Sequence, residues 1–400
     1  MRVLLSDGSG LTSRQAATRL GALGHHVEIL SSTPLCLTRF TRHVRALHEV
    51  PRFADDPLKW FDAANRIATA RSIDVLLPTQ EQVAVLAALR ARLAAKTVVP
   101  DFAALRRVQD KIAAWRTLQA IGLPQPASVV VKSKDDLAEI TQFPVFVKRP
   151  IATASTGVRR AASRDELVIA AAALGLDNEP LLVQSQATGP LAMVQALADR
   201  GRLVAHHANL RVVEGIGGGA AVKESVELPT LAGHLERLVR ALDWHGPISM
   251  DVIVTEDGPL IIDVNPRLVE PINAQLAGTD LVGTMLELAQ NRHPPALPVG
   301  RAGVRSRQLL LSVLGAALRG SRRAVLSELM AALRGRGAYS DAVEELTPVG
   351  GDPIAAVPLV LAVLATLINP SLCRLFHKGG TGPYALTPDA WRKILAVSEQ

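Results

Sequence analysis

Two acidic residues set inside apolar β-strands constrain this chain more than any other feature. Residues 246–267 read as two strands, 248–254 and 260–264, joined by a Glu-Asp-Gly turn that is typical of a hairpin. Asp251 and Asp263 lie on the two strands among Ile and Val residues, where an unpaired carboxylate would be costly. We therefore predict a functional site on this hairpin.

The spacing along the second strand predicts a metal site. Residues i and i+2 of a strand point to the same face, so Asp263, Asn265 and Arg267 project together and Asp251 approaches from the paired strand. Two carboxylates and an amide oxygen suit Mg²⁺, with Mn²⁺ as an alternative. Arg267 would then hold an anionic phosphate or acyl phosphate beside the metal. The alternative is a hairpin whose acids simply face water.

Two lysines in different contexts give a second signal. Lys111 follows Asp110 at the start of a predicted helix, and Lys148 ends the predicted strand 144–148. A lysine at the end of a buried strand is rare as packing and common as a phosphate contact. The small-residue loop that follows could bring backbone N–H groups to a phosphate. Its candidate contacts are Ser155, Thr156 and Gly157.

The length of 400 residues predicts two or three domains. The first hundred residues alternate strands with helices, which favours a small parallel sheet. A helix is expected from Asp101 through Ala120, ending at Gly122, and composition changes beyond Pro294-Pro295. The expected N-terminal strands are 2–6, 26–30 and 74–77, with helices at 12–23 and 81–95. Further strands are expected at 128–132, 145–148, 181–184, 193–198 and 203–209, with a short helix at 135–140.

The turn after the first strand contains Gly8-Ser9-Gly10, which invites comparison with a dinucleotide-binding loop. Ser13 stands where that fingerprint has its third glycine, and the second strand ends in Ser31-Ser32 without an acid for a ribose hydroxyl. The pattern therefore favours a tight turn between strand and helix over a nicotinamide or flavin site.

The charge of the chain is unevenly distributed. Lys+Arg 44 against Asp+Glu 37 gives +7. Residues 301–337 hold eight arginines and one acid, Glu328, so this stretch accounts for the whole excess, and the neutral remainder argues against nucleic-acid binding. Two cysteines, Cys36 and Cys373, cannot form a disulfide framework, and the first residues do not resemble a signal peptide. We expect a cytoplasmic protein.

The arginine-rich stretch predicts two helices, 306–319 and 321–334, with Ser321 as the cap of the second. The apolar run 354–368 is too short to span a bilayer. Three interpretations stay open: a solvated helical pair that covers the catalytic body, a site for a phosphate- or carboxylate-rich substrate, and a peripheral contact with an anionic membrane through residues 301–368.

Taken together, residues 1–292 resemble an ATP-grasp enzyme of the biotin-carboxylase and carbamoyl-phosphate-synthase type. Asp110-Lys111 with Ile121-Gly-Leu-Pro124, and Phe143-Pro-Val-Phe-Val-Lys148, resemble the two ATP-lysine segments of that family. Asp263-Val-Asn265-Pro-Arg267 resembles its Glu-x-Asn-Pro-Arg motif, with Asp251 at the family's 12-residue offset. Lys223, six residues before Pro229, has the spacing of the family's substrate-side lysine.

The resemblance implies an α/β (α+β) architecture built around an ATP-grasp fold. It implies a Rossmann-like pre-ATP-grasp domain at residues 1–100 and an ATP-grasp domain at 101–295, with a lid subdomain at about 126–184. An arginine-rich, mainly helical extension would follow at 296–400. Members of the family are often dimers, so a homodimer is one expected state.

The resemblance also implies a role for each matching residue. Lys111 and Lys148 would hold the ATP phosphates, and Gln184, Ser185 and Ala187 would face adenine. The metal would bind Asp251, Asp263 and Asn265, while Lys223, Arg211 and Arg267 would line the transferred phosphate and the acceptor.

The implied reaction is attack of a substrate carboxylate on the γ-phosphate of ATP, followed by capture of the acyl phosphate by an amine, with release of ADP and phosphate. Activation of bicarbonate and a non-catalytic ATP-binding sensor or scaffold are the alternatives. Two departures from the family motivate the sensor: Leu191 replaces an expected acid, and the lid has only Gly157. Gln184 in place of the common glutamate and Asp263 in place of the metal-binding glutamate are tolerable replacements.

Overall fold

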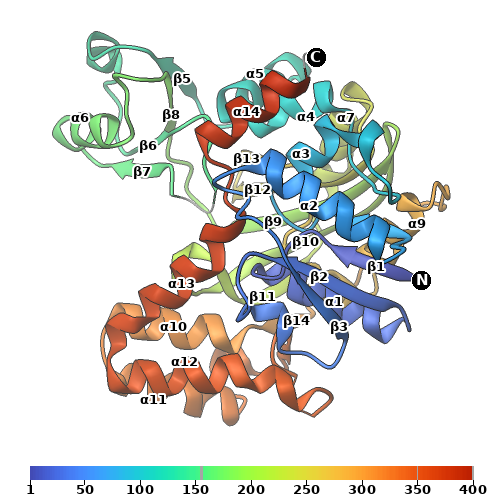
Figure 1. The fold of residues 1–400 in the computed structure, drawn as a ribbon. Helices are drawn as coiled ribbons and strands as arrows, with labels where there is room; N and C mark the ends of the chain where they lie inside the picture. Colours follow the sequence, from blue (N-terminus) through green and yellow to red (C-terminus); the bar gives the residue numbers. More distant parts are fainter. Residues whose placement is uncertain (154–155, 349, 399–400) are drawn as a thin grey trace.

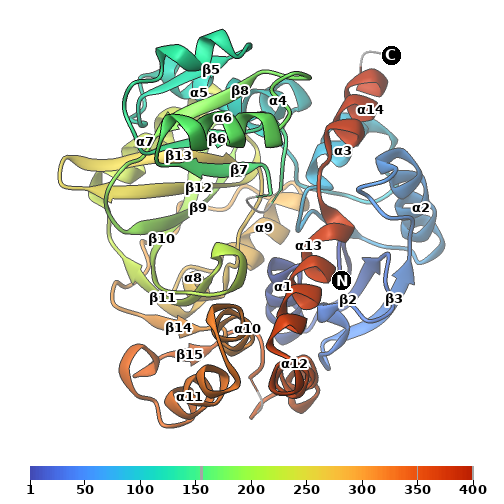
Figure 2. The same cartoon turned by 90° about the vertical axis from the view of Figure 1, so that its left-hand side faces the viewer.

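The computed structural model describes residues 1–153, 156–348 and 350–398, without the side chains of 377–379. Its strands form three sheets, one each in the N-terminal region, a small lid and the central body. Figures 1 and 2 show the lid at one end of the molecule and a group of C-terminal helices at the other, with the N-terminal sheet beside the central body.

The N-terminal sheet is parallel, with strand order β3-β2-β1-β4. The expected parallel sheet is confirmed, because continuous apolar runs bury strands β1, β2 and β4 on both faces. Strand β3 and helix α2 were not expected: β3 is a polar, half-exposed edge strand, and α2 begins where the Asp56 carboxylate accepts hydrogen bonds from the N–H groups of Leu58 and Lys59. The elements are β1 (Arg2–Leu5), α1 (Leu11–Ala22), β2 (His26–Ser31), β3 (Val44–Glu49), α2 (Pro57–Ala70), β4 (Val75–Leu77) and α3 (Val83–Ala88).

The glycine turn after β1 is closed by a side chain of its own. The Asp7 carboxylate accepts hydrogen bonds from the N–H groups of Ser9 and Gly10, both at 2.7 Å. A Cβ on Gly10 would lie 2.0 Å from Nε2 of Gln80, so only glycine fits there. The backbone donors that a phosphate would need are thus bonded to Asp7, and the segment is a tight turn between strand and helix.

The helix predicted from Asp101 through Ala120 is wrong in one respect, since the structure has two helices there. They are α4 (Phe102–Gln109) and α5 (Lys111–Ile121). Asp110 between them is extended, and its carboxylate accepts hydrogen bonds from the N–H groups of Ile112 and Ala113. An N-cap of this kind starts a new helix, which places Lys111 at its first position.

The lid is a four-stranded antiparallel sheet of order β5-β8-β6-β7, covered on one face by α6. It has a core of its own, with Val147, Leu167 and Val183 among its buried residues. The predicted short helix at 135–140 is a 3₁₀ segment, Asp135–Glu139. The elements are β5 (Ser128–Val131), β6 (Val145–Lys148), β7 (Val158–Ala161), α6 (Arg164–Ala173) and β8 (Leu181–Ser185).

The central body is a seven-stranded sheet of order β13-β12-β9-β10-β11-β14-β15. The predicted hairpin is confirmed as β12 and β13, in which Asp251 pairs with Asp263. The elements up to residue 289 are β9 (Leu191–Asp199), β10 (Arg202–Glu214), β11 (Ala220–Val226), α7 (Pro229–Ala241), β12 (Gly246–Thr255), β13 (Gly258–Asn265), α8 (Ile272–Ala277) and α9 (Leu281–Ala289).

The C-terminal region is mainly helical, but it begins as part of the central sheet. The predicted helix 306–319 starts three residues late, because Arg305–Arg307 form β14 against β11, where Arg305 bonds to Glu224. Ser321 is the predicted cap of α11. The elements are β14, α10 (Leu309–Arg319), α11 (Arg322–Leu333), β15 (Val343–Glu344), α12 (Ala356–Ile368), α13 (Cys373–Thr381) and α14 (Pro388–Ser398).

The last helix returns to the N-terminal region. Trp391 and Ile394 of α14 are buried in the same core as Trp60 and Phe61 of α2, and the Trp391 ring lies 5.8 Å from that of Phe102. Figure 2 shows α14 beside α2 and α3. Within the described part of the chain, no helix is both long and apolar enough to cross a membrane.

Candidate active site

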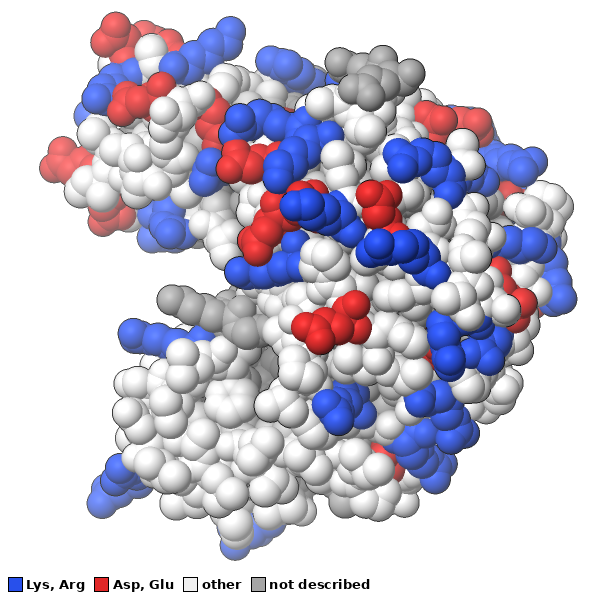
Figure 3. Space-filling model, in the orientation of Figure 1, with Lys and Arg blue, Asp and Glu red and all other residues white. Residues whose placement is uncertain are grey.

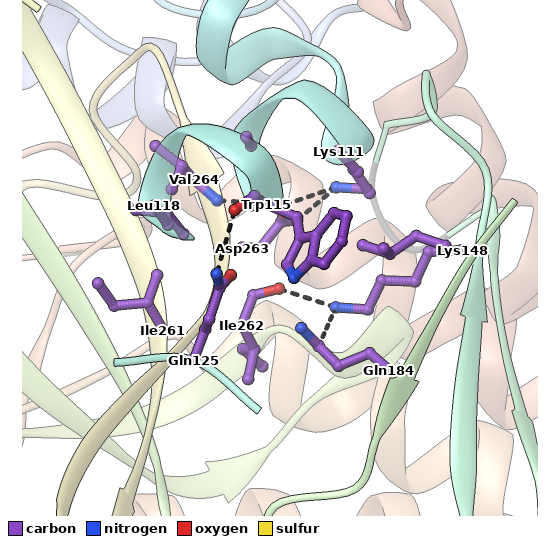
Figure 4. Close-up of a pocket in the computed structure, with 12 residues that line it drawn as sticks. Lys111, Trp115, Leu118, Gln125, Lys148, Gln184, Ile261, Ile262, Asp263 and Val264 are labelled. Carbon is purple, nitrogen blue, oxygen red and sulfur yellow. Dashed lines mark hydrogen bonds and ion pairs between the residues drawn. The ribbon is translucent and has the colours of Figure 1, made fainter. Parts of the chain in front are cut away.

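A small pocket lies between the lid and the central sheet, and residues from both line it (Figure 4). Helix α5 contributes Lys111 and Trp115, while β6 and β8 of the lid contribute Lys148 and Gln184. The floor is the strand segment 261–264 of β13. The pocket thus combines a cationic side with an apolar one, to which Trp115, Leu118, Leu182 and Ile261 belong.

Lys111 bonds to the hairpin carboxylate. Its Nζ lies 2.7 Å from Oδ1 and 2.5 Å from Oδ2 of Asp263. Burial alone would raise the pKa of Asp263, but the charges of Lys111 and Lys148 outweigh it and lower the pKa below its ordinary value. Asp263 is therefore held as a carboxylate in the free protein.

Lys148 reaches the same strand from the lid. Its Nζ donates to Oε1 of Gln184 at 2.7 Å and to the carbonyl oxygen of Ile262 at 2.8 Å. Both partners are neutral, and burial lowers the pKa of Lys148 to about 8. This ammonium therefore lacks a bonded counter-charge, which an anionic ligand could supply.

The two hairpin acids meet as the sequence predicts, because register-paired residues share one face of a sheet. Burial, and next the neighbouring Asp263, raise the pKa of Asp251 to about 6. Asn265 lies two residues beyond Asp263 on the same strand. Two carboxylates and an amide oxygen are hard-oxygen donors of the kind that Mg²⁺ takes. Among the described residues, no group of three or more His, Cys, Asp or Glu could hold a metal ion, so a metal here would rest on two acids and Asn265.

Only some of the residues predicted to contact adenine and the phosphates line the pocket. Gln184 lines the pocket, whereas Ser185 and Ala187 do not. Gly157 is required in the loop because a Cβ there would lie 2.3 Å from that of Ala152. Thr156 donates to the carbonyl oxygen of Thr153 at 2.7 Å. Ser155 lies outside the described residues.

Arg267 stands between this pocket and a second polar cluster. Its guanidinium contacts Glu81 of the N-terminal region at 3.1 Å, and its charge also interacts with Asp251. Burial alone would lower the pKa of Arg267, but Glu81 and other anionic groups raise it. Arg267 is therefore a permanent cation beside the predicted metal ligands.

The second cluster is centred on Lys223, which is 1% exposed. Its Nζ lies 2.6 Å from Glu270 and 2.8 Å from Glu345. Burial alone would lower its pKa, but these two carboxylates raise it. Glu270 adopts a left-handed φ of 54°, which costs a non-glycine residue energy and is found mainly at functional sites. We call Lys223, Glu270 and Glu345 the acceptor-side cluster.

Arg211 is the register partner of Lys223 on the neighbouring strand. Its guanidinium bonds to the carbonyl oxygen of Gly218 at 2.7 Å and to Glu214 at 3.0 Å. The structure therefore places Arg211 beside Lys223 in the sheet. Its guanidinium is held by Glu214 at the end of β10 and by Gly218 in the loop that follows.

Sequence reasoning missed the residues that other regions contribute to the acceptor-side cluster. Gln15 of α1 donates to Glu345 at 2.7 Å, Ser306 of β14 does so at 2.5 Å, and Gln308 donates to Glu270. Tyr384 is buried near Arg267 and Glu270 and interacts with both electrostatically. No local motif marks these residues; the only sequence signal was the position of Glu270 just beyond the Asn-Pro-Arg motif.

The comparisons with known proteins show which domain and which fold this chain resembles. Residues 108–271 match the model of an ATP-grasp domain. The fold is similar to that of a biotin carboxylase from Campylobacter jejuni, solved with β-γ-ATP, with a TM-score of 0.62 at 15% identity, over 76% of this chain and 74% of that one.

Two further solved structures are similar. The biotin carboxylase domain of a 2-oxoglutarate carboxylase from Hydrogenobacter thermophilus, solved with MgADP, ADP and bicarbonate, has a TM-score of 0.61 at 16% identity, over 76% of this chain and 73% of that one. An N5-carboxyaminoimidazole ribonucleotide synthetase from Thermus thermophilus has a TM-score of 0.57 at 20% identity, over 74% of this chain and 80% of that one. The chain has the fold of these proteins, and its residues 108–271 are an ATP-grasp domain.

Proposed function

We propose that this protein is an ATP- and Mg²⁺-dependent ligase that activates a substrate carboxylate as an acyl phosphate. The observation that carries the proposal is the meeting of Lys111 and Lys148, from two different parts of the fold, on the strand segment Ile262–Asp263. Lys148 has neutral partners only, so a phosphate would complete its charge pairing. The apolar side of the pocket, around Trp115 and Leu182, suits the adenine ring.

In the proposed reaction a carboxylate oxygen of the substrate attacks the γ-phosphorus of ATP, the bond to the β,γ-bridging oxygen breaks, and ADP leaves. An amine then attacks the acyl carbon, loses a proton and displaces inorganic phosphate. Lys111 and Lys148 would hold the phosphates in line, and Arg267 would neutralise charge on the transferred group. Asp251, Asp263 and Asn265 would hold Mg²⁺, which supplies charge neutralisation to the phosphates when it is bound.

The acceptor would bind beside Arg267 and the acceptor-side cluster. Lys223 is already paired with two carboxylates, so its part in this proposal is to orient Glu270 toward the substrate, while Arg267, whose guanidinium also contacts Glu81, supplies positive charge. Arg211, on the neighbouring strand, would add a second cation at the rim.

A second candidate function is the activation of bicarbonate. The neighbour from Hydrogenobacter thermophilus was solved with bicarbonate. Incorporation of labelled bicarbonate into product would favour this candidate over the carboxylate–amine reaction.

The test is to incubate the protein with ATP, Mg²⁺ and pooled carboxylates and amines, and to measure ADP and phosphate. Asp263→Ala and Arg267→Ala are expected to abolish turnover, while Glu256→Ala, at the exposed turn of the same hairpin, should leave it unchanged. Release of AMP and pyrophosphate would refute the acyl-phosphate reaction. Tight ATP binding without substrate-stimulated ADP release would instead identify a sensor.

A further inference from the structure

Helix α12 is apolar on all sides but buried on only one. Its sequence, AVPLVLAVLATLI, contains no charged residue. Ala362 and Thr366 are buried, and Leu359, Val363 and Leu367 pack against the C-terminal core. A helix that is hydrophobic all round is normally enclosed, so its outer side calls for a partner. That side carries Val357, Val360, Leu361, Leu364 and Ile368, which are 37% to 71% exposed.

The neighbouring helices extend this apolar surface. Helix α11 packs beside α12 and exposes Leu326, Met330 and Leu333, at a spacing that puts them on one helical face. On α13, Leu375 is 65% exposed. Single exposed apolar residues are ordinary on a protein surface, whereas a continuous patch marks an interaction site. We call these exposed residues of α11, α12 and α13 the apolar face.

The exposed charges of residues 319–376 are almost all positive. Among the described residues of 319–376, six arginines are exposed and Asp341 is the one exposed acid. Arg322 donates to the carbonyl oxygen of Ile368 at 2.6 Å, which holds a guanidinium beside the most exposed apolar residue of α12. Figure 3 shows the lower lobe as a largely uncharged surface with basic side chains at its edge and no acidic ones. The exposed arginines are Arg319, Arg322, Arg323, Arg334, Arg336 and Arg374.

The other acids of this segment do not offset that charge, because most of them are engaged within the protein. Glu345 is buried against Lys223, and Asp352 is buried against Arg14. Glu344 lies near Arg307, and Glu328 accepts a hydrogen bond from the Tyr339 hydroxyl. The C-terminal helices therefore present an apolar surface and surrounding cations together.

We propose that the apolar face binds peripherally to a membrane surface that contains anionic lipids. Leu361, Leu364 and their neighbours would enter the boundary between headgroups and acyl chains, while the arginines contact lipid phosphates. A second copy of this chain fits less well, because a symmetric contact would bring like-charged arginines together. Figure 1 places the lid at the far end of the molecule from α11 and α12, so docking would leave the lid free.

The test is co-sedimentation of the full chain with vesicles of phosphatidylcholine alone or mixed with phosphatidylglycerol. The wild-type chain should bind only the mixed vesicles, and salt should weaken the binding. Leu361→Asp with Leu364→Asp, and Arg322→Gln with Arg323→Gln, should each reduce the vesicle affinity roughly tenfold or more.

The matched control is Val168→Asp with Ile169→Asp on α6, which changes two exposed apolar residues of the lid and should leave vesicle binding unchanged. Unfolding midpoints of all variants show whether each is folded. Equal binding of the α12 variant and the wild type, or no binding of the wild type to mixed vesicles, would overturn the proposal. So would a wild-type dimer in solution that the α12 variant abolishes without any vesicle binding by either.

Discussion

Two buried lysines in this protein have opposite electrostatic surroundings. Lys148, at the end of a lid strand, bonds to an amide oxygen and a backbone carbonyl, and burial lowers its pKa to about 8. Lys223, on the central sheet, bonds to Glu270 and Glu345, which raise its pKa despite burial. Both residues end in the same ammonium group and both are almost fully buried.

The difference shows that bonded counter-charge, and not burial, decides what a buried lysine can do. Lys223 is neutralised within the protein and therefore acts as part of its structure. Lys148 interacts with the charges of Asp263 and Asp251 but hydrogen-bonds to neither, and Asp263 is bonded to Lys111, so Lys148 is prepared for a negatively charged ligand. One lysine completes the charge pairing of its cluster, and the other leaves its pocket without a bonded counter-charge.

The largest expected effect comes from breaking the Lys223 cluster. Lys223→Met would leave two carboxylates buried without a cation, and removal of one partner of a buried pair costs about 3–5 kcal/mol. We expect a loss of that size in the free energy of unfolding, measured by urea denaturation. Lys223→Met with Glu345→Gln should recover part of it, because one of the two unpaired charges is gone. Unchanged stability in the single variant would contradict the pairing.

The Lys148→Met variant should behave in the opposite way. In the proposed reaction this substitution removes a phosphate contact, so ATP-dependent turnover should fall about 100- to 1000-fold. The free energy of unfolding should change by no more than about 2 kcal/mol, because only neutral hydrogen-bond partners are left behind. Turnover and urea denaturation on the same preparation test both statements. A stability loss equal to that of Lys223→Met would show that the two lysines do not differ as described.

The smallest effect extends the comparison to two buried carboxyls of the N-terminal region. Burial raises the pKa of Asp7 to about 6, since its partners are backbone and hydroxyl donors. For Glu28 burial alone would also raise the pKa, but Arg71, His48 and Arg2 lower it to about 2. The contribution of Asp7 to stability should therefore decline as pH rises from about 4 to about 6, whereas that of Glu28 should be lost as pH falls from about 4.5 to about 2.

Each contribution is about 3 kcal/mol. Asp7→Asn should reduce the pH dependence of stability between about pH 4 and 6, and Glu28→Gln should reduce it between about pH 2 and 4.5. Unfolding midpoints measured across this pH range test both statements. If the two substitutions changed the pH dependence of stability with the same sign, bonded counter-charge would not decide the pKa of these buried carboxyls.

Local rules predicted most elements of the chain and the centre of its site. Apolar runs and turn residues located β1, β2, β4 and the hairpin, and the two-residue period of a strand put Asp251 and Asp263 on one face. They failed at Arg305–Arg307, which form a strand only because the edge of β11 is there to pair with. They also missed the break between α4 and α5, although its cause is local: the Asp110 carboxylate caps the next helix through the N–H groups of Ile112 and Ala113.

By itself the sequence determined the hairpin, the positions of Lys111 and Lys148 at the start of a helix and the end of a strand, and the arginine-rich segment, because periodicity, turn chemistry and charge are properties of neighbouring residues. Only the tertiary structure decided what those charges meet. Glu345 stands 122 residues from Lys223, and Glu81 stands 186 residues from Arg267. The state of a buried charge depends on partners brought in by the fold, so the sequence could name the cations while the structure decided which of them is left for a ligand.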